Sequence, residues 1–192
     1  MSEAERTDLN RLRDIIRNAQ QQGDQYPVDP KARVSVGSEG EIYTGEAPSG
    51  RPLSKVQHGT FAARVHGREV EDVRWAARHM PRNTRFIDHQ EARGWCYSFR
   101  SQMGRPYTMF AYFDGYSYQV KLVEPRLEGL VGVHTAHLFT SGKLCLSQHG
   151  GSGQPTLEEA YSKSVLWATG MDVVLAGYPF PFSVNNEAEY DL

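Results

Sequence analysis

The feature that most restricts the fold of this chain is a stretch between residues 95 and 122 in which apolar side chains, many of them aromatic, recur at every second position. Aromatic residues occupy every second position from Trp95 to Phe99, residues 107–113 follow as a further strand-like segment, and the alternation returns in residues 116–122. A period of two puts successive side chains on opposite faces of a β-strand. Asp114-Gly115, between the last two segments, favours a two-residue hairpin turn. The stretch therefore predicts three or four consecutive antiparallel strands, a β-meander with aromatic residues filling its faces.

Helical periodicity occurs twice before the meander. Residues 8–22 repeat apolar side chains every three or four positions, and Thr7 or Asp8 can cap the start of this helix. A second helix is predicted from Arg68 to about His79, and Pro81 ends it. The buried side of this second helix is expected to consist of five apolar residues: Val70, Val73, Ala76, Ala77 and Met80.

A third helix is predicted after the meander. Thr156, with Glu159 three positions later, forms a capping box at its start, and Gly170 is expected to end it after Thr169. Its inner side is expected to contain Leu157, Ala160, Tyr161, Ser164, Val165 and Ala168. Helix, meander, irregular segment and helix in this order predict an α+β fold, with helices packed on one face of an antiparallel sheet.

The N-terminal region differs from the rest of the chain in composition. Residues 23–59 are rich in Gly, Pro and Ser, and they separate the first helix from the second. Two short β-like runs within them, residues 33–36 and 41–44, are joined by four residues and predict a hairpin. We therefore expect an N-terminal extension over residues 1–60, made of a helix and a hairpin, and a core domain over residues 61–192.

Composition and charge exclude several classes of function. The chain has 192 residues, and its 21 Lys and Arg against 23 Asp and Glu give a net charge of −2, so it lacks the basic surface of a general nucleic-acid binder. No apolar run approaches the roughly 20 residues of a membrane span, and residues 1–8 lack the apolar region of a signal peptide. Two cysteines suit a reducing compartment. We expect a globular, cytoplasmic protein whose partners include neither nucleic acid nor a membrane.

Cys145 is the most informative single residue for the chemistry. If residues 143–147 are extended, Leu144 and Leu146 point to one side and Cys145 points to the other. Because the leucines are expected to face the core, the thiol should lie on the polar side and be accessible as a nucleophile. Cys96 lies in the middle of a predicted strand and has no group of polar residues around it in the sequence. It is therefore expected to lie in the core or on the surface of the sheet.

Three histidines lie near Cys145 in the sequence: His134, His137 and His149. With Cys145 they have the donor types of a zinc site, but no C-x-x-C pair is present, and the spacing of His134 and His137 misses the H-x-H of JAB-type metallopeptidases. A cysteine protease with a histidine base is a second alternative, although its local signatures are absent. The third alternative is that the histidines only hydrogen-bond the loop. The glycine-rich residues 150–153 lack the lysine and hydroxyl of a phosphate-binding loop.

The block around Cys145 resembles the active-site segment of ubiquitin-conjugating enzymes. In that family His-Pro-Asn and a short variable stretch precede Gly-x-(Ile/Leu)-Cys-Leu, and residues 142–146 read Gly-Lys-Leu-Cys-Leu. His137 stands at the place of the family's asparagine, eight residues before the cysteine. Residues 112–120, followed by Pro125, are similar to the family's hairpin and the strand that ends in proline. The resemblance extends over residues 67–180, and its specificity lies in the residues up to Leu146.

The chain also departs from the family's pattern. Thr135 and Ala136 replace the family's His-Pro, the Tyr-Pro-x-x-Pro-Pro segment is absent, and a short tail stands in place of the further C-terminal helices. Residues 1–60 have no counterpart. Divergence of this kind resembles the bacterial conjugating enzymes of antiviral defence operons, which also encode a ubiquitin-like protein, an adenylating activating enzyme and a JAB-type peptidase.

The resemblance implies a transthiolation enzyme that needs no cofactor and no metal. Cys145 is expected to accept the C-terminal glycyl group of a ubiquitin-like protein from the cysteine of an activating enzyme, and to pass it to an amine of an acceptor protein. His137 is expected to donate a hydrogen bond to the oxyanion or to shape the loop. His134, Ser147 and His149 are expected to support these two residues.

The resemblance also implies a binding surface for the activating enzyme. In the family the first helix of the domain makes this contact, and here that helix carries Arg68, Arg74 and Arg78. The alternative function is a catalytically inactive module of the same fold that binds a ubiquitin-like protein. Retention of Cys145 within its glycine and leucine frame counts against this alternative.

Overall fold

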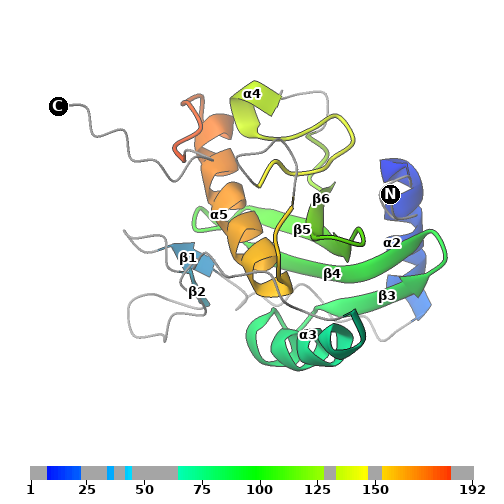
Figure 1. Cartoon of the computed structure of the whole chain (residues 1–192). Helices are drawn as coiled ribbons and strands as arrows, with labels where there is room; N and C mark the ends of the chain where they lie inside the picture. Colours follow the sequence, from blue (N-terminus) through cyan, green and yellow to red (C-terminus); the bar gives the residue numbers. More distant parts are fainter. Residues whose placement is uncertain are drawn as a thin grey trace.

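A computed structural model describes residues 8–22, 34–36, 42–44, 65–127, 133–146 and 153–182 of the chain. Its centre is one antiparallel sheet in which each strand pairs with its neighbour along the chain, in the order β3-β4-β5-β6 (Figure 1). The predicted meander is therefore confirmed, and the fold is α+β. The strands are β3 (Arg85–His89), β4 (Ala92–Arg100), β5 (Pro106–Phe113) and β6 (Tyr118–Glu124).

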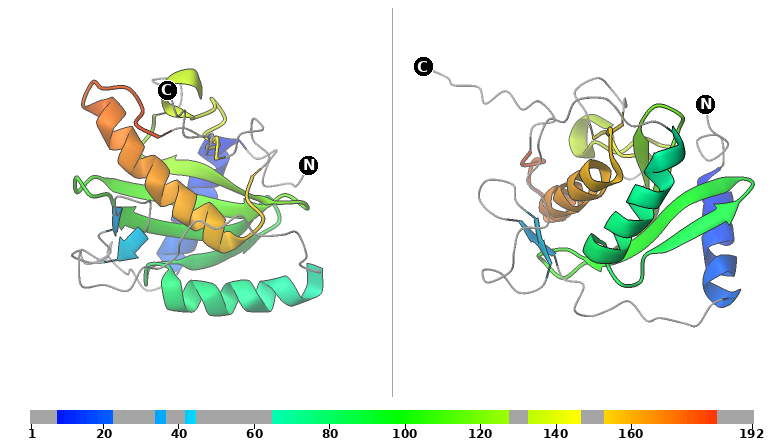
Figure 2. Two further views of the ribbon diagram at one scale, coloured as in Figure 1. Left: turned by 60° about the vertical axis from the view of Figure 1, so that its left-hand side comes forward. Right: turned by 60° about the horizontal axis from the view of Figure 1, so that its bottom comes forward.

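Helices cover both faces of this sheet, not one face as the sequence predicted. Helix α2 (Leu9–Gln22) packs on one face, and α3 (Val65–His79) and α5 (Leu157–Leu175) pack on the other (Figure 2). In β4 the aromatic residues Trp95, Tyr97 and Phe99 belong to the cluster under α3 and α5, whereas Cys96 belongs to the cluster under α2. Most side chains of β4 are buried, whichever face of the sheet they point to. Both faces of the central strands therefore have to be covered.

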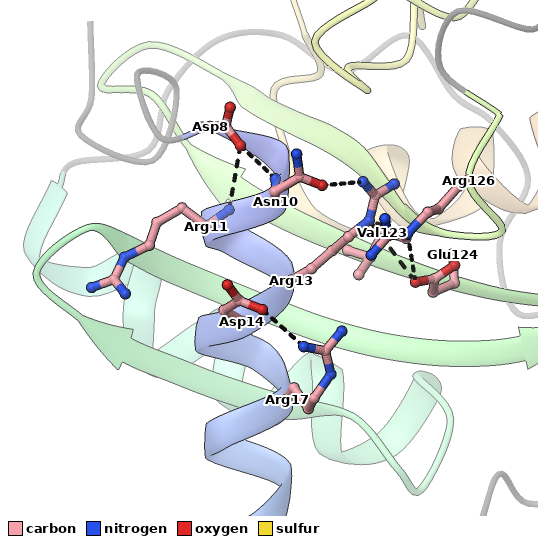
Figure 3. A network of polar contacts seen from close by, with 9 residues as sticks. All are labelled: Asp8, Asn10, Arg11, Arg13, Asp14, Arg17, Val123, Glu124 and Arg126. Carbon is pink, nitrogen blue, oxygen red and sulfur yellow. Dashed lines mark hydrogen bonds and ion pairs between the residues drawn. The ribbon is translucent and has the colours of Figure 1, made fainter.

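Helix α2 begins where the sequence predicted. The Asp8 carboxylate accepts a hydrogen bond from the backbone N–H of Asn10 at 2.6 Å, and Leu9, Leu12, Ile15 and Ile16 are buried against the sheet. Arg13 is also buried, and its Nε donates to the carbonyl oxygen of Val123 in β6 at 2.8 Å (Figure 3). This polar contact adds a specific orientation to the apolar packing of α2 on the sheet.

The inner face of α3 differs from the prediction. Ala76 and Met80 are buried as expected, but Val73 is 53% exposed and Ala77 is also exposed. Asp72 takes the inner position, because its carboxylate accepts a hydrogen bond from the hydroxyl of Tyr118 at the start of β6. The buried side of α3 therefore includes Asp72 in place of Val73 and Ala77. The described helix also begins three residues before the predicted Arg68.

Helix α5 has the predicted start and a later end. The hydroxyl of Thr156 accepts from the backbone N–H of Glu159 at 3.1 Å, so the predicted N-cap is confirmed. The helix does not stop at Gly170 but continues to Leu175. All six residues predicted for its inner side are buried: Leu157, Ala160, Tyr161, Ser164, Val165 and Ala168.

Three smaller elements complete the described structure. Strands β1 (Val34–Val36) and β2 (Ile42–Thr44) pair antiparallel, as the predicted hairpin requires. A single turn of helix, α4 (Val133–Ala136), precedes the segment that contains Cys145. None of the helices in the described part of the chain combines the length and the apolar character needed to cross a membrane.

Candidate functional site

Residues 137–146 fold back on themselves and bring His137 beside Cys145. The backbone N–H of Cys145 donates to the carbonyl oxygen of His137 at 2.8 Å, and Leu138 and Leu144 form an antiparallel bridge. The same segment is fixed to β6, because the N–H of Leu144 donates to the carbonyl oxygen of Val120 at 2.8 Å. Two residues that are eight positions apart in the sequence are therefore held next to each other through the backbone.

Cys145 is the accessible cysteine of the two. Leu144 and Leu146 on either side of it are buried, with 1% and 7% of their surface exposed, whereas Cys145 is only partly buried. The predicted alternation is thus confirmed up to Leu146. Cys96 is 5% exposed beneath α2, and burial raises the pKa of its thiol to about 12. At neutral pH Cys96 is therefore a protonated core residue.

His137 adopts a backbone conformation that few side chains tolerate. Its φ of +52° lies in the left-handed region, and it is the one residue other than glycine with a positive φ in the part of the chain that the structure describes. Histidine, asparagine and aspartate are enriched in this conformation. The backbone thus gives a physical reason why histidine can stand at this position, and why asparagine would suit it as well.

Gly142 allows the turn before Cys145 to rest on α2. Its φ is +76°, and a Cβ placed there would lie 2.6 Å from Cδ2 of Leu9 and 3.3 Å from the carbonyl oxygen of Leu122. Both the conformation and the space exclude a side chain. The glycine of the Gly-x-Leu-Cys-Leu block therefore has a structural task, which is to let the loop approach the first residue of α2.

The carbonyl oxygen of Leu146, directly after Cys145, is held by two side chains. Nε2 of Gln154 donates to it at 2.7 Å and Nζ of Lys163 donates to it at 3.3 Å. Gln154 is itself bridged to Tyr118 through two backbone hydrogen bonds. Burial lowers the pKa of the Lys163 ammonium, and the nearby Glu159 acts in the opposite direction. Sequence analysis missed both side chains, because each reaches a backbone group that no sequence pattern indicates.

The residues before His137 are tied to α5. Nε1 of Trp167 donates to the carbonyl oxygen of Ala136 at 2.7 Å. After α5 the chain turns back, and the ring of Phe180 packs edge-to-face on His137 with 5.0 Å between the ring centroids. Phe180 also lies against Gly170, where a Cβ would come within 2.6 Å of its Cζ. Gly170 is therefore a packing residue in the middle of α5 and not the stop that the sequence suggested.

This contact predicts that the effect of Gly170→Ala on stability depends on Phe180. Alanine normally stabilises a helix interior by up to about 1 kcal/mol relative to glycine, but here its methyl group would displace the Phe180 ring. We expect Gly170→Ala to lower the free energy of unfolding in the wild-type background and to lower it less in a Phe180→Ala background, where Phe182, whose Cδ2 would lie 3.0 Å from the new Cβ, still restricts the space. Denaturant unfolding of the four proteins forms a double-mutant cycle. Additive effects would show that Phe180 does not pack against Gly170.

Several predicted site residues lie outside what the structure describes. His134 belongs to α4, but its side chain and that of Arg68 are not among the described ones, and Ser147 and His149 lie outside the described residues altogether. Arg74 and Arg78 are described, and both are exposed on α3. Within the described ranges no group of three or more His, Cys, Asp or Glu side chains is arranged to hold a metal ion.

Comparison with family models, with characterised proteins and with solved structures finds no match to the chain. The site must therefore be interpreted from its own geometry. That geometry consists of a partly exposed thiol framed by two buried leucines, a histidine held beside it through the backbone, and an ammonium and an amide that fix the carbonyl after it. Such an arrangement is compatible with acyl transfer through a cysteine, because the thiol is partly exposed while hydrogen bonds hold the backbone that carries it.

Proposed function

We propose that this chain is a conjugating enzyme for a ubiquitin-like protein, which it carries as a thioester on Cys145. The observation that carries the proposal is the setting of this thiol: it is partly exposed between Leu144 and Leu146, and its backbone N–H is bonded to His137. The similarity of residues 142–146 to the active-site block of conjugating enzymes adds support. So does the order of elements, in which a four-stranded meander precedes the cysteine and a long helix follows it.

The proposed reaction begins with exchange between two thioesters. The sulfur of Cys145 attacks the C-terminal glycyl carbonyl that the modifier presents on the cysteine of an activating enzyme. A tetrahedral oxyanion forms, and it collapses as the C–S bond to the activating enzyme breaks; that sulfur leaves as a thiolate, which takes up the proton that the Cys145 thiol gives up. Because the bond formed and the bond broken are alike, the site has to position the groups and stabilise the oxyanion more than to drive the exchange.

The second step transfers the glycyl group to an amine of an acceptor protein. The amine nitrogen forms a C–N bond to the carbonyl carbon, the C–S bond to Cys145 breaks, and the thiolate takes up the proton that the nitrogen loses. His137 is the proposed hydrogen-bond donor to the oxyanion, since the fold-back places it next to Cys145. We further propose a bacterial, cytoplasmic pathway of antiviral defence, which rests only on the way the sequence diverges from the family.

The direct test uses the activating enzyme and the ubiquitin-like protein encoded by neighbouring genes. With both proteins and ATP, the chain should gain the mass of one modifier, and a reducing agent should remove it. An intact chain that binds the modifier but never gains this adduct would instead support the inactive binding module. Mass spectrometry with and without reductant distinguishes the two outcomes.

The proposed docking surface on α3 gives a prediction about charge. Arg74 and Arg78 are exposed and one turn apart, and a cationic pair of this kind can attract an acidic partner surface. We expect Arg74→Glu with Arg78→Glu to slow charging at least about tenfold at low salt. Added salt should reduce the difference in charging rate between the variant and the wild type, because it screens the attraction in the wild type and the repulsion in the variant.

A matched control reverses two exposed arginines elsewhere on the surface. Arg93 and Arg126 pair with Asp88 and Glu124, and exposed pairs of this kind contribute little to stability. Reversal of both gives the same change in net charge without altering α3. If this control slows charging as much as the α3 variant, the effect comes from net charge and not from a docking surface on α3.

A further inference from the structure

Lysine is sparse in this chain, and one lysine lies beside the candidate thiol. Five lysines stand among the 21 Lys and Arg residues. Of the three in described segments, Lys121 is 2% exposed within the sheet, whereas Lys143 and Lys163 are partly buried near Cys145. The ammonium of Lys163 lies 3.3 Å from the carbonyl oxygen of Leu146, the residue that directly follows Cys145.

The two lysines near Cys145 are directed differently. Lys143 is two residues before Cys145, but its Nζ lies over the ring of Phe139 at 5.5 Å from the centroid, within its own turn. Lys163 comes from α5 and reaches the backbone on the far side of the cysteine. This hydrogen bond places the amine of Lys163 next to the backbone that directly follows Cys145.

The environment of Lys163 also favours reactivity. An amine attacks a carbonyl only in its neutral form, and burial lowers the pKa of Lys163, although Glu159 opposes the shift. A nucleophile held close to its target reacts at a high effective concentration, since the entropy of bringing the two groups together is already lost. Position and protonation therefore both make Lys163 a better acceptor than an exposed lysine.

We propose that Lys163 is a self-acceptor site, which takes the glycyl group from the Cys145 thioester of the same molecule. This inference rests on the proposed function, because it needs an acyl group on Cys145. The Lys163 nitrogen forms a C–N bond to the thioester carbonyl, the C–S bond breaks, and the Cys145 thiolate accepts the proton that the nitrogen gives up. The product is a stable amide on α5 and a free thiol, so the acceptor site becomes permanently modified.

The experiment loads the purified full chain with a defined probe. A peptide that ends in Gly-Gly, supplied as its mercaptoethanesulfonate thioester, exchanges onto an accessible thiol without an activating enzyme. We expect two adducts of equal mass: one on Cys145 that excess thiol removes, and one on Lys163 that it does not remove. Peptide mapping by mass spectrometry locates both. Cys145→Ala should lose both adducts, because the Lys163 amide forms through the thioester.

Lys163→Arg and Lys143→Arg are matched variants. Arginine keeps a positive charge and hydrogen-bond donors that can reach Leu146, but it is not a nucleophile at neutral pH. Lys163→Arg should lower the ratio of the thiol-resistant to the thiol-sensitive adduct at least about tenfold, whereas Lys143→Arg should keep the wild-type ratio. A mixture of Cys145→Ala with Lys163→Arg should form no amide on Lys163, since transfer takes place within one molecule.

The outcomes separate this inference from the proposed function. A thioester on Cys145 without a thiol-resistant adduct, or with that adduct on Lys143, would overturn the self-acceptor site and leave the proposed function standing. An amide on Lys163 in the mixed sample would overturn transfer within one molecule. Failure of Cys145 to exchange with the probe at all would contradict both, because each requires an accessible thiol.

Discussion

Cys145→Ala should abolish the reductant-sensitive adduct completely, whereas Cys96→Ser should charge at the wild-type rate. Cys145 is the partly exposed thiol of the pair, and Cys96 lies beneath α2 with a strongly raised pKa. Because thioester exchange needs an accessible sulfur, we expect Cys145 and not Cys96 to carry the acyl group. Cys145→Ser should either trap the modifier as an ester that resists reductant or give no adduct. Gel shift with and without reductant measures all three variants.

The control for this prediction is folding. Cys96 belongs to the buried cluster between α2 and the sheet, so its replacement by serine places a hydroxyl in an apolar setting and costs stability. Circular dichroism and thermal unfolding identify any loss of structure before charging is compared. A well-folded Cys96→Ser protein that fails to charge, together with a Cys145→Ala protein that charges, would show that the thioester site has been assigned to the wrong cysteine.

Removal of the His137 side chain should slow discharge to a free amine by roughly 10²–10³-fold, as the loss of one oxyanion donor does in other acyl-transfer sites. The fold-back brings the backbone of this residue beside Cys145, and the proposed role is donation from a ring nitrogen to the oxyanion. The measurement is a single-turnover discharge of preformed thioester to lysine or hydroxylamine. Charging of Cys145 by the probe thioester provides a separate readout, which shows that the thiol is still accessible.

Three substitutions separate the donor role of His137 from its backbone role. At a φ of +52°, alanine is disfavoured by about 1 kcal/mol, whereas glycine is not. His137→Gly should therefore keep more stability than His137→Ala while losing the same amount of rate. His137→Asn should recover part of the rate, with a flatter pH profile between about pH 6 and 8, because an amide is a fixed donor that does not exchange a proton there. Discharge within about twofold of wild type for both Gly and Ala would reduce His137 to a residue that braces the loop.

The fold was predictable wherever one periodicity dominated. Alternation and Asp114-Gly115 predicted β4, β5 and β6, and the apolar stripe of residues 9–19 predicted α2. The prediction allowed for a fourth strand but did not locate β3, because Ile87 is its one buried residue and the strand has no alternation to detect. The predicted inner face of α3 was partly wrong, because Asp72 contacts Tyr118, a residue 46 positions away in the sequence. A pattern within one segment contains no information about such a partner.

The same distinction applies to the site. The exposure of Cys145 followed from its two leucine neighbours, and a local pattern was enough to predict it. Lys163 and Phe180 were not predicted, because their places depend on how α5 and the tail after it return to the loop. Gly170 was interpreted from its usual role at helix ends, whereas here it is required by the ring that packs on it. Side chains whose contacts are far away in the sequence can be recognised as site residues only once the fold is known.

The contacts around residues 137–146 also bear on the order in which this loop is completed during synthesis. Leu9, near the start of the chain, lies against Gly142, and Phe180, near its other end, lies against His137. Ribosomes add about 5–20 residues per second, and N-terminal parts leave the tunnel first. Residues 137–146 are therefore translated well before the ring that completes their surroundings. In a growing chain Cys145 would therefore lie on a loop that lacks the Phe180 contact until residue 180 has left the ribosome.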